Sequence, residues 1–163
     1  MQATQLSQRV TRASLYRERA LGLMTGRVSE GIALLLCRLA LAGVFWRSGR
    51  TKVVDGSWLE VSDTTHYLFR EEYAGVPLPA EFSMYLATYG EHLFPVLLVL
   101  GLVTRFAALS LLLMTLTIQF FVYPDAWWPT HSLWAALSMI LMCRGAGLFS
   151  LDAVSLRKAQ ANA

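Results

Sequence analysis

Three ionisable residues lie where the sequence is otherwise apolar. Glu91 and His92 are neighbours in the run 82–103, and Arg38 lies inside the run 31–46. Pro95 follows Glu91 by four residues, and a helical proline there removes the hydrogen bond that would reach the Glu91 carbonyl. A carboxyl, an imidazole and a freed backbone oxygen would then lie together. Because such groups are costly in hydrocarbon, they predict a functional site.

The chemistry that these residue types could perform is proton transfer linked to a redox change. Glu91 would accept a proton, Arg38 would offset its charge, and His92 or Tyr89 would hydrogen-bond a quinone headgroup. A stripe of polar and aromatic residues recurs at helical spacing, formed by Tyr85, Thr88, Tyr89 and His92. The alternative is that this face only packs against its neighbours through satisfied hydroxyls.

Whether Arg38 reaches Glu91 depends on their depths. At 1.5 Å per residue, Arg38 lies roughly 10 Å and Glu91 roughly 18 Å above the inner ends of their runs. An arginine side chain closes part of this gap, although its Cβ direction tilts it toward the inner end. The sequence therefore allows a direct ion pair between Arg38 and Glu91 without requiring it. Such a pair would be either structural or part of a proton- or ligand-binding site.

A further histidine, His131, opens the run 130–143 and is a second candidate for cofactor binding. His131 and His92 could together be the two axial ligands of a haem. The two histidines differ in depth, however, and the sequence has no other feature of a haem site. The cofactor stays open: a quinone fits, and haem is disfavoured. Cys37 and Cys143 have no CxxC spacing and no His/Cys cluster, so no metal site is predicted.

Membrane-spanning helices would have to position these side chains. The 163-residue chain is 55% hydrophobic and 15% charged, against about 25% charged in soluble domains. Its apolar runs, 31–46, 82–103, 106–123 and 130–143, are too long and continuous for barrel strands. The sequence predicts an all-α, four-transmembrane-helix bundle, with a basic arm at 1–30, a membrane domain at 31–155 and a tail at 156–163.

Charge distribution predicts how this bundle is oriented. With four spans, nine of the 14 Lys and Arg residues fall on the side of the termini and four on the other side. The positive-inside rule then places both termini in the cytoplasm of a bacterial inner membrane. The basic arm would be an amphipathic helix on anionic headgroups or a disordered tail. The connection 47–81 is rich in aromatics and predicts a short helix or a re-entrant piece, and no nucleic-acid-binding module is visible.

Short motifs resemble those of the DoxX family of small four-helix membrane proteins. Arg38-Leu39-Ala40, with Gly49 and Lys52 after it, is similar to the family's first helix. Glu91, Pro95 and the segment 100–105, Leu-Gly-Leu-Val-Thr-Arg, are similar to its second helix and turn. Residues 144–152, Arg-Gly-Ala-Gly-Leu-Phe-Ser-Leu-Asp, are similar to its closing segment, with Ala146 where relatives often have proline. The resemblance covers residues 31–155.

The resemblance implies a redox-linked, quinone- or thiol-associated inner-membrane subunit, with roles for Arg38, Lys52, Glu91 and Arg105. Relatives are described as oxidoreductase components, and one belongs to a thiosulfate:quinone oxidoreductase. A protein partner in a membrane complex, or a homo-oligomer, is expected beside the lipid bilayer.

The alternative is a non-catalytic scaffold. Its long periplasmic loop, similar to that of a proteobacterial subgroup often found beside metal-peptide biosynthesis genes, would engage a metal-handling or stress-response partner through Trp58 and Tyr67. A small-solute transporter is least favoured, because only Pro95 suggests a broken helix.

Overall fold

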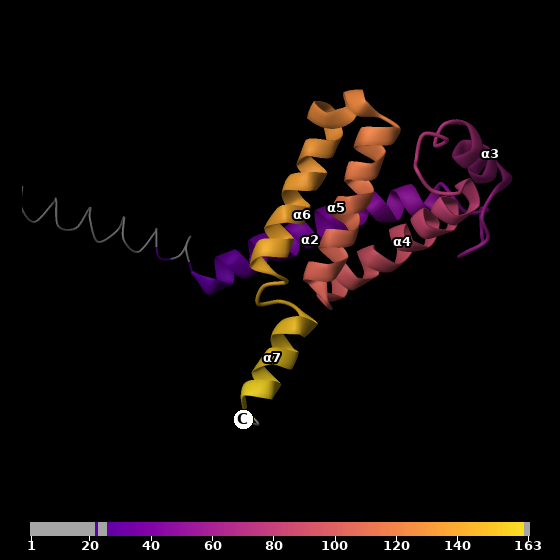
Figure 1. Ribbon diagram of the computed structural model, residues 1–163. Helices are drawn as coiled ribbons and strands as arrows, with labels where there is room; N and C mark the ends of the chain where they lie inside the picture. Colours follow the sequence, from indigo (N-terminus) through magenta and orange to yellow (C-terminus); the bar gives the residue numbers. More distant parts are fainter. Residues whose placement is uncertain (1–21, 23–25, 162–163) are drawn as a thin grey trace, which may run out of the picture.

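The computed structural model describes residue 22 and residues 26–161, and over these residues the chain is all-helical (Figure 1). The helices are α2 (Arg27–Arg50), α3 (Asp63–Glu71), α4 (Ala80–Leu100), α5 (Thr104–Phe121), α6 (Ser132–Arg144) and α7 (Leu151–Ala161). A 3-10 turn, Pro124–Ala126, and a π-helical turn, Trp127–His131, join α5 to α6. The predicted all-α class is confirmed. Most of the predicted basic arm lies outside the described residues.

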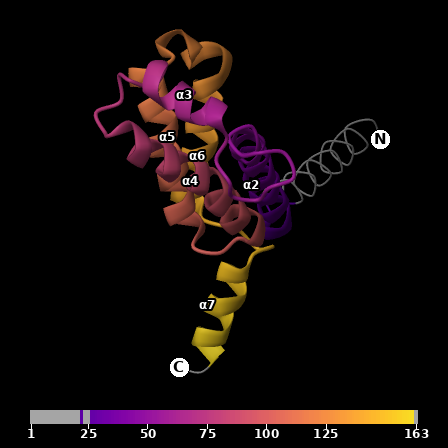
Figure 2. The same cartoon turned by 90° about the vertical axis from the view of Figure 1, so that its right-hand side faces the viewer.

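One hydrophobic core is shared by α2, α4, α5 and α6. Its fully buried members include Leu41 and Phe45 of α2, Leu98 of α4, Leu111 of α5 and Leu141 of α6. Helix α4 packs against α2 and α5, and α6 packs against α5 and α2 (Figure 2). Because lipid is as apolar as these side chains, close packing rather than hydrophobic burial favours their association inside a bilayer.

Two of the helices, α2 and α5, are long and apolar enough to cross a membrane. Both also expose large apolar side chains, among them Leu36 and Leu113, which suits contact with lipid. The other two predicted spans coincide with α4 and α6. Helix α6 has 13 residues, short of the about 20 that a span needs, and the preceding π-helical turn adds five.

At one end of the bundle, the α4–α5 turn is hydrogen-bonded to the segment that follows α6. Gly101 has φ +65° and makes the turn, and its carbonyl accepts a hydrogen bond from the Asp152 N–H at 2.9 Å. The Asp152 carboxylate accepts the N–H groups of Val103 and Thr104 at 2.9 and 3.1 Å, which caps the start of α5. Helix α7 begins here and projects away from the other helices without a buried residue (Figure 1).

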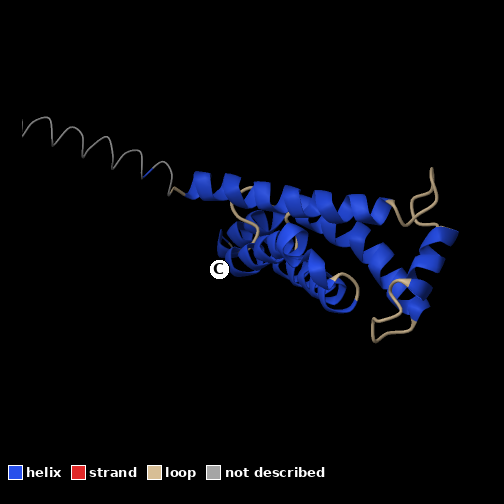
Figure 3. Ribbon diagram, turned by 90° about the horizontal axis from the view of Figure 1, so that it is seen from above, coloured by secondary structure: helices blue, strands red, loops and turns tan. Residues whose placement is uncertain are grey.

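At the opposite end of the bundle, α3 and its flanking loops lie beside the start of α4 (Figure 3). Ser62 caps α3 by accepting the Thr65 N–H at 3.3 Å, so the predicted short helix in the connection is present. The loop after α3 reaches the end of α5, where a Cβ on Gly75 would lie 2.9 Å from the Phe121 carbonyl oxygen. This loop therefore bridges α4 and α5 at this end of the bundle.

Candidate functional site

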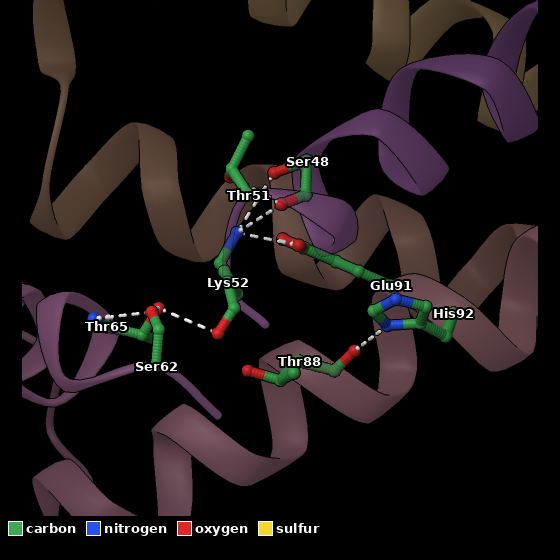
Figure 4. A network of polar contacts seen from close by, with 8 residues as sticks. All are labelled: Ser48, Thr51, Lys52, Ser62, Thr65, Thr88, Glu91 and His92. Carbon is green, nitrogen blue, oxygen red and sulfur yellow. Dashed lines mark hydrogen bonds and ion pairs between the residues drawn. The ribbon is translucent and has the colours of Figure 1, made fainter. Parts of the chain in front are cut away.

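Glu91 forms a buried ion pair with Lys52. The Lys52 Nζ lies 2.6 Å from Glu91 Oε2, and the two side chains are 7% and 2% exposed (Figure 4). The same ammonium donates to Ser48 Oγ at 3.0 Å. Two charges that are costly alone in hydrocarbon thus neutralise each other and keep further hydrogen-bond partners.

Lys52 reaches this position because α2 continues beyond residue 46 to Arg50. A tight turn then brings Lys52 back, with its N–H donating to the Gly49 carbonyl at 3.0 Å. The Lys52 carbonyl accepts the Thr65 hydroxyl at 2.9 Å, which ties the residue to α3 (Figure 4). Gly49 allows the close approach of α2 to α4, because a Cβ there would lie 2.9 Å from the His92 ring and 3.1 Å from Glu91 Cβ.

Arg38 does not pair with Glu91. The sequence left a direct ion pair between them open, and the structure shows that each has other partners. Its Nη1 donates to the Leu98 carbonyl at 3.1 Å and its Nη2 to the Phe149 carbonyl. Arg38 is fully buried and points toward the N-terminal end of α2, as the Cβ direction of a helix favours. The Leu98 carbonyl also accepts the Gly101 N–H at 3.1 Å, so Arg38 shares this acceptor at the end of α4, where the partial negative charge of the helix attracts a cation. The role of offsetting the Glu91 charge belongs to Lys52.

His92 is buried beside Glu91 but faces a different neighbour. Its Nδ1 lies 2.7 Å from the Thr88 carbonyl, and its ring meets Trp46 of α2 edge-on at 5.2 Å. The buried Nε2 has no hydrogen-bond partner. With Nδ1 protonated and bonded to its own helix, the neutral ring presents Nε2 as a free acceptor.

The predicted stripe along α4 divides into two faces. Thr88 and His92 are buried, whereas Tyr85 and Tyr89 are exposed. The two tyrosine rings stack on each other at 5.8 Å, and Tyr85 also contacts His66 of α3 edge-on at 6.4 Å. Residues four apart in a helix share a face. Thr88 and His92 therefore lie on a buried face of α4, and Tyr85 and Tyr89 lie on an exposed one. The tyrosines therefore do not face the Lys52–Glu91 pair.

His131 lies apart from this pair, at the start of α6. Its Nδ1 is 2.7 Å from Gln119 Oε1, and Gln119 Nε2 donates to the Pro124 carbonyl at 2.6 Å. The ring contacts Trp134 at 5.1 Å. The His131 and His92 imidazoles thus engage different helices, and His131 fastens the α5–α6 connection.

The ion pair lines a cavity of about 280 Å³ between α4, α5 and the loop after α3. Most of its wall is apolar or aromatic, with contributions from Phe69, Tyr73, Leu86, Phe94, Leu113 and Met114. Its polar groups are few: Lys52, Glu91 and the hydroxyls of four residues, Tyr73, Ser83, Ser110 and Thr117. A concave apolar chamber with a few convergent polar groups is typical of a site for a small molecule.

Aromatic residues close one end of this cavity. Tyr73 stacks on Phe69 at 4.6 Å and meets Tyr123 edge-on at 6.2 Å. The Tyr123 hydroxyl donates to Glu72 Oε2 at 2.7 Å, which links the loop to the end of α5. Burial raises the pKa of Tyr73 above its usual range, and the hydrogen bond to Glu72 raises the pKa of Tyr123. Both phenols therefore stay neutral at physiological pH.

Sequence reasoning missed Tyr73, Phe69 and the pairing of Lys52. The sequence does contain the motif of Gly49 followed three residues later by Lys52, which marks Lys52 as a candidate. Its contact with Glu91, however, depends on the turn after α2, which helical periodicity does not predict. Among residue 22 and residues 26–161, no cluster of three His, Cys, Asp or Glu side chains could hold a metal ion. The arrangement suits hydrogen bonding and proton exchange with a small, largely apolar ligand.

Comparison with known proteins agrees with the family that the motifs resemble. The family model described as DoxX matches residues 33–124. An uncharacterized protein of Haemophilus influenzae is 29% identical over 133 residues, which is 77% of this chain and 84% of that protein. No solved structure gives a significant match.

Proposed function

Since the chain belongs to the DoxX family of membrane proteins, we propose that it is a redox-linked subunit that binds a quinone headgroup between α4 and α5. The observation that carries the proposal is the buried Lys52–Glu91 pair in the wall of an otherwise apolar cavity. A quinone combines an apolar ring with carbonyl oxygens that need donors. The Lys52 ammonium supplies such a donor.

The proposed topology has four spans, α2, α4, α5 and α6 with its π-helical turn, in a bacterial inner membrane. Both termini are cytoplasmic, in keeping with the excess of Lys and Arg on that side. The α3 region then lies at the periplasmic side, and the cavity lies in the outer half of the membrane. Exposed apolar residues on the proposed spans, among them Leu86 and Leu113 beside the cavity, face lipid.

The size of the cavity decides which part of the ligand it would hold. At about 280 Å³ it is at the lower end of the range for ligand pockets, which is about 300–1,000 Å³. It suits a single ring, with an isoprenoid tail outside among the lipid chains. Reduction of the quinone to quinol takes two electrons and two protons. Two thiols on a partner protein supply the two electrons and the two protons as they form a disulfide, and Glu91 accepts the protons one after the other beside Lys52 and passes them to the two quinone oxygens.

A photoreactive quinone analogue tests the binding step in purified protein. We expect labelled peptides from α4 and α5, and severalfold weaker labelling in Glu91→Gln and in Ala87→Phe, which fills the cavity. Glu81→Gln is the matched control, because it removes a carboxylate of the same helix that is well exposed. Labelling that is equal in all four proteins would overturn the proposal.

The second candidate is a scaffold whose outer loop binds a partner, and the exposed aromatics of that loop favour it. Trp58 is 72% exposed and Tyr67 is 67% exposed, although both belong to ordered segments around α3. Side chains of this kind are enriched in protein interfaces. If Trp58→Ala and Tyr67→Ala abolish function in cells while Glu91→Gln does not, the function of the protein depends on partner binding by the loop and not on quinone chemistry at Glu91.

A further inference from the structure

A second pocket lies at the inner end of the helices, away from the Lys52–Glu91 pair. It has a volume of about 590 Å³ and is formed where α5 begins, where α6 ends and where the chain returns into α7. Two arginines, Arg105 and Arg144, are in its wall. The quinone proposal does not use this pocket, and nothing below depends on that proposal.

The Arg105 guanidinium has unused hydrogen-bonding capacity. Its Nη2 approaches the Cys143 carbonyl at 3.4 Å, which is longer than the 2.7–3.2 Å of an ordinary N–H···O bond. The side chain is exposed, and it passes over Gly145, where a Cβ would lie 3.5 Å from Arg105 Nε. A guanidinium has five N–H donors, so most of them have no acceptor among residue 22 and residues 26–161.

The other ionic groups at this end are already engaged. Arg144 donates through Nε at 2.9 Å and through Nη2 to Glu30 Oε1, and its remaining amino group is free for another acceptor. Asp152 uses both carboxylate oxygens on the N–H groups of Val103 and Thr104, so its charge is compensated by the start of α5. The pocket therefore offers donors from arginine, while the carboxylate in its wall, Asp152, already accepts two N–H groups.

An unpaired hydroxyl and an apolar rim complete the pocket. Thr104 lies in the wall, and its Oγ1 is buried without a hydrogen-bond partner. Val103, Phe106 and Leu156 also line the pocket and are at least half exposed. A ligand that suits both parts has phosphate oxygens at one end and hydrocarbon at the other.

We propose that this pocket binds the phosphate headgroup of an anionic phospholipid, with Arg105 as the main ligand and Arg144 as the second. The acyl chains of this phospholipid lie against Phe106 and the lipid-facing surface of α5. Basic pockets between helices at a membrane surface bind lipid headgroups in this way. Arginine is suited to phosphate because its planar fork donates two parallel hydrogen bonds.

Native mass spectrometry of the full-length protein in detergent, with phosphatidylglycerol added, tests the proposal. We expect one phosphatidylglycerol retained per chain, and a fivefold or greater loss of the lipid-bound fraction in Arg105→Gln. Arg157→Gln removes the same charge from α7, outside the pocket, and is expected to retain the lipid like wild type. Because Arg105 has one long internal contact, its substitution should leave the melting temperature unchanged without lipid, which checks that the variant is folded.

Competing ligands separate the sources of the phosphate group. Inorganic phosphate at millimolar concentration and phosphatidylcholine are both expected to compete poorly with phosphatidylglycerol. Equal losses in Arg105→Gln and Arg157→Gln would show a diffuse charge effect and overturn the proposal. Full displacement by inorganic phosphate would show an anion site without lipid preference, and full displacement by phosphatidylcholine would show no preference for anionic lipid. Either result would overturn it too.

Discussion

Substituting Lys52 by methionine is expected to destabilise the protein by about 3–5 kcal/mol, because it leaves the Glu91 carboxylate buried without its cation. The two charged atoms are 2.6 Å apart, and their side chains are 7% and 2% exposed, so solvent cannot replace the lost partner. For a chain of 150–250 residues, 1 kcal/mol corresponds to about 2–4 °C in melting temperature. The expected shift is therefore about 6–20 °C downward.

The double variant Lys52→Met/Glu91→Leu separates the cost of an unpaired charge from the value of the pair. Replacing a buried pair by apolar residues of similar volume is often neutral or stabilising. The double variant should therefore regain most of the stability that Lys52→Met loses. Recovery of this kind would show that the pair is kept for a purpose other than stability, such as ligand binding.

Melting curves in detergent, followed by tryptophan fluorescence, measure both effects. Arg70→Met is the matched control, since the Arg70–Glu81 pair is 3.0 Å long but its side chains are 63% and 57% exposed. An exposed pair contributes about 0–1 kcal/mol, so this control should melt within about 4 °C of wild type. Equal shifts in Lys52→Met and Arg70→Met, or no recovery in the double variant, would refute the reasoning.

Three further substitutions probe the contacts around the site. Gly49→Ala places a Cβ 2.9 Å from the His92 ring and should cost about 1–3 kcal/mol through overpacking, measured by the same melts. Arg38→Met removes the hydrogen bonds to the Leu98 and Phe149 carbonyls, of which Leu98 keeps another donor, the Gly101 N–H, and should cost about 1–3 kcal/mol, read as increased proteolysis of the C-terminal segment. The raised pKa of Tyr73 stabilises the fold fully below about pH 10, the ordinary tyrosine value, and this contribution is lost as pH rises further. Between pH 9 and about pH 11, melting temperatures should therefore fall more in wild type than in Tyr73→Phe.

The helices could be predicted from the sequence because each core-forming helix is a continuous apolar run. The run 82–103 became α4 at Ala80–Leu100, and 106–123 became α5 at Thr104–Phe121. The ends shifted by two or three residues because capping decides them, as the Asp152 cap does for α5. Helix α7 was not predicted, since its sequence has no strong apolar face.

The partners of the buried charges could not be predicted from helix periodicity. Depth alone left Arg38 as the candidate partner for Glu91, whereas Lys52 reaches the carboxylate from a turn that folds back over α4. Arg38 instead binds backbone carbonyls, one of them from Phe149, far away in the sequence. The aromatic end of the cavity depends on Tyr73, whose position is set by loop packing rather than by a repeating pattern.

The hydrogen bond from Arg38 to the Phe149 carbonyl has a consequence for biogenesis. Arg38 enters the membrane early in synthesis, when the Leu98 and Phe149 carbonyls that bind it have not yet been made. A lone arginine at the centre of a span costs about 3 kcal/mol on insertion scales. Helix α2 of the nascent chain therefore carries this cost until residue 149 has been made. The contact between Arg38 and the segment that follows α6 can form only after α6 itself has been synthesised.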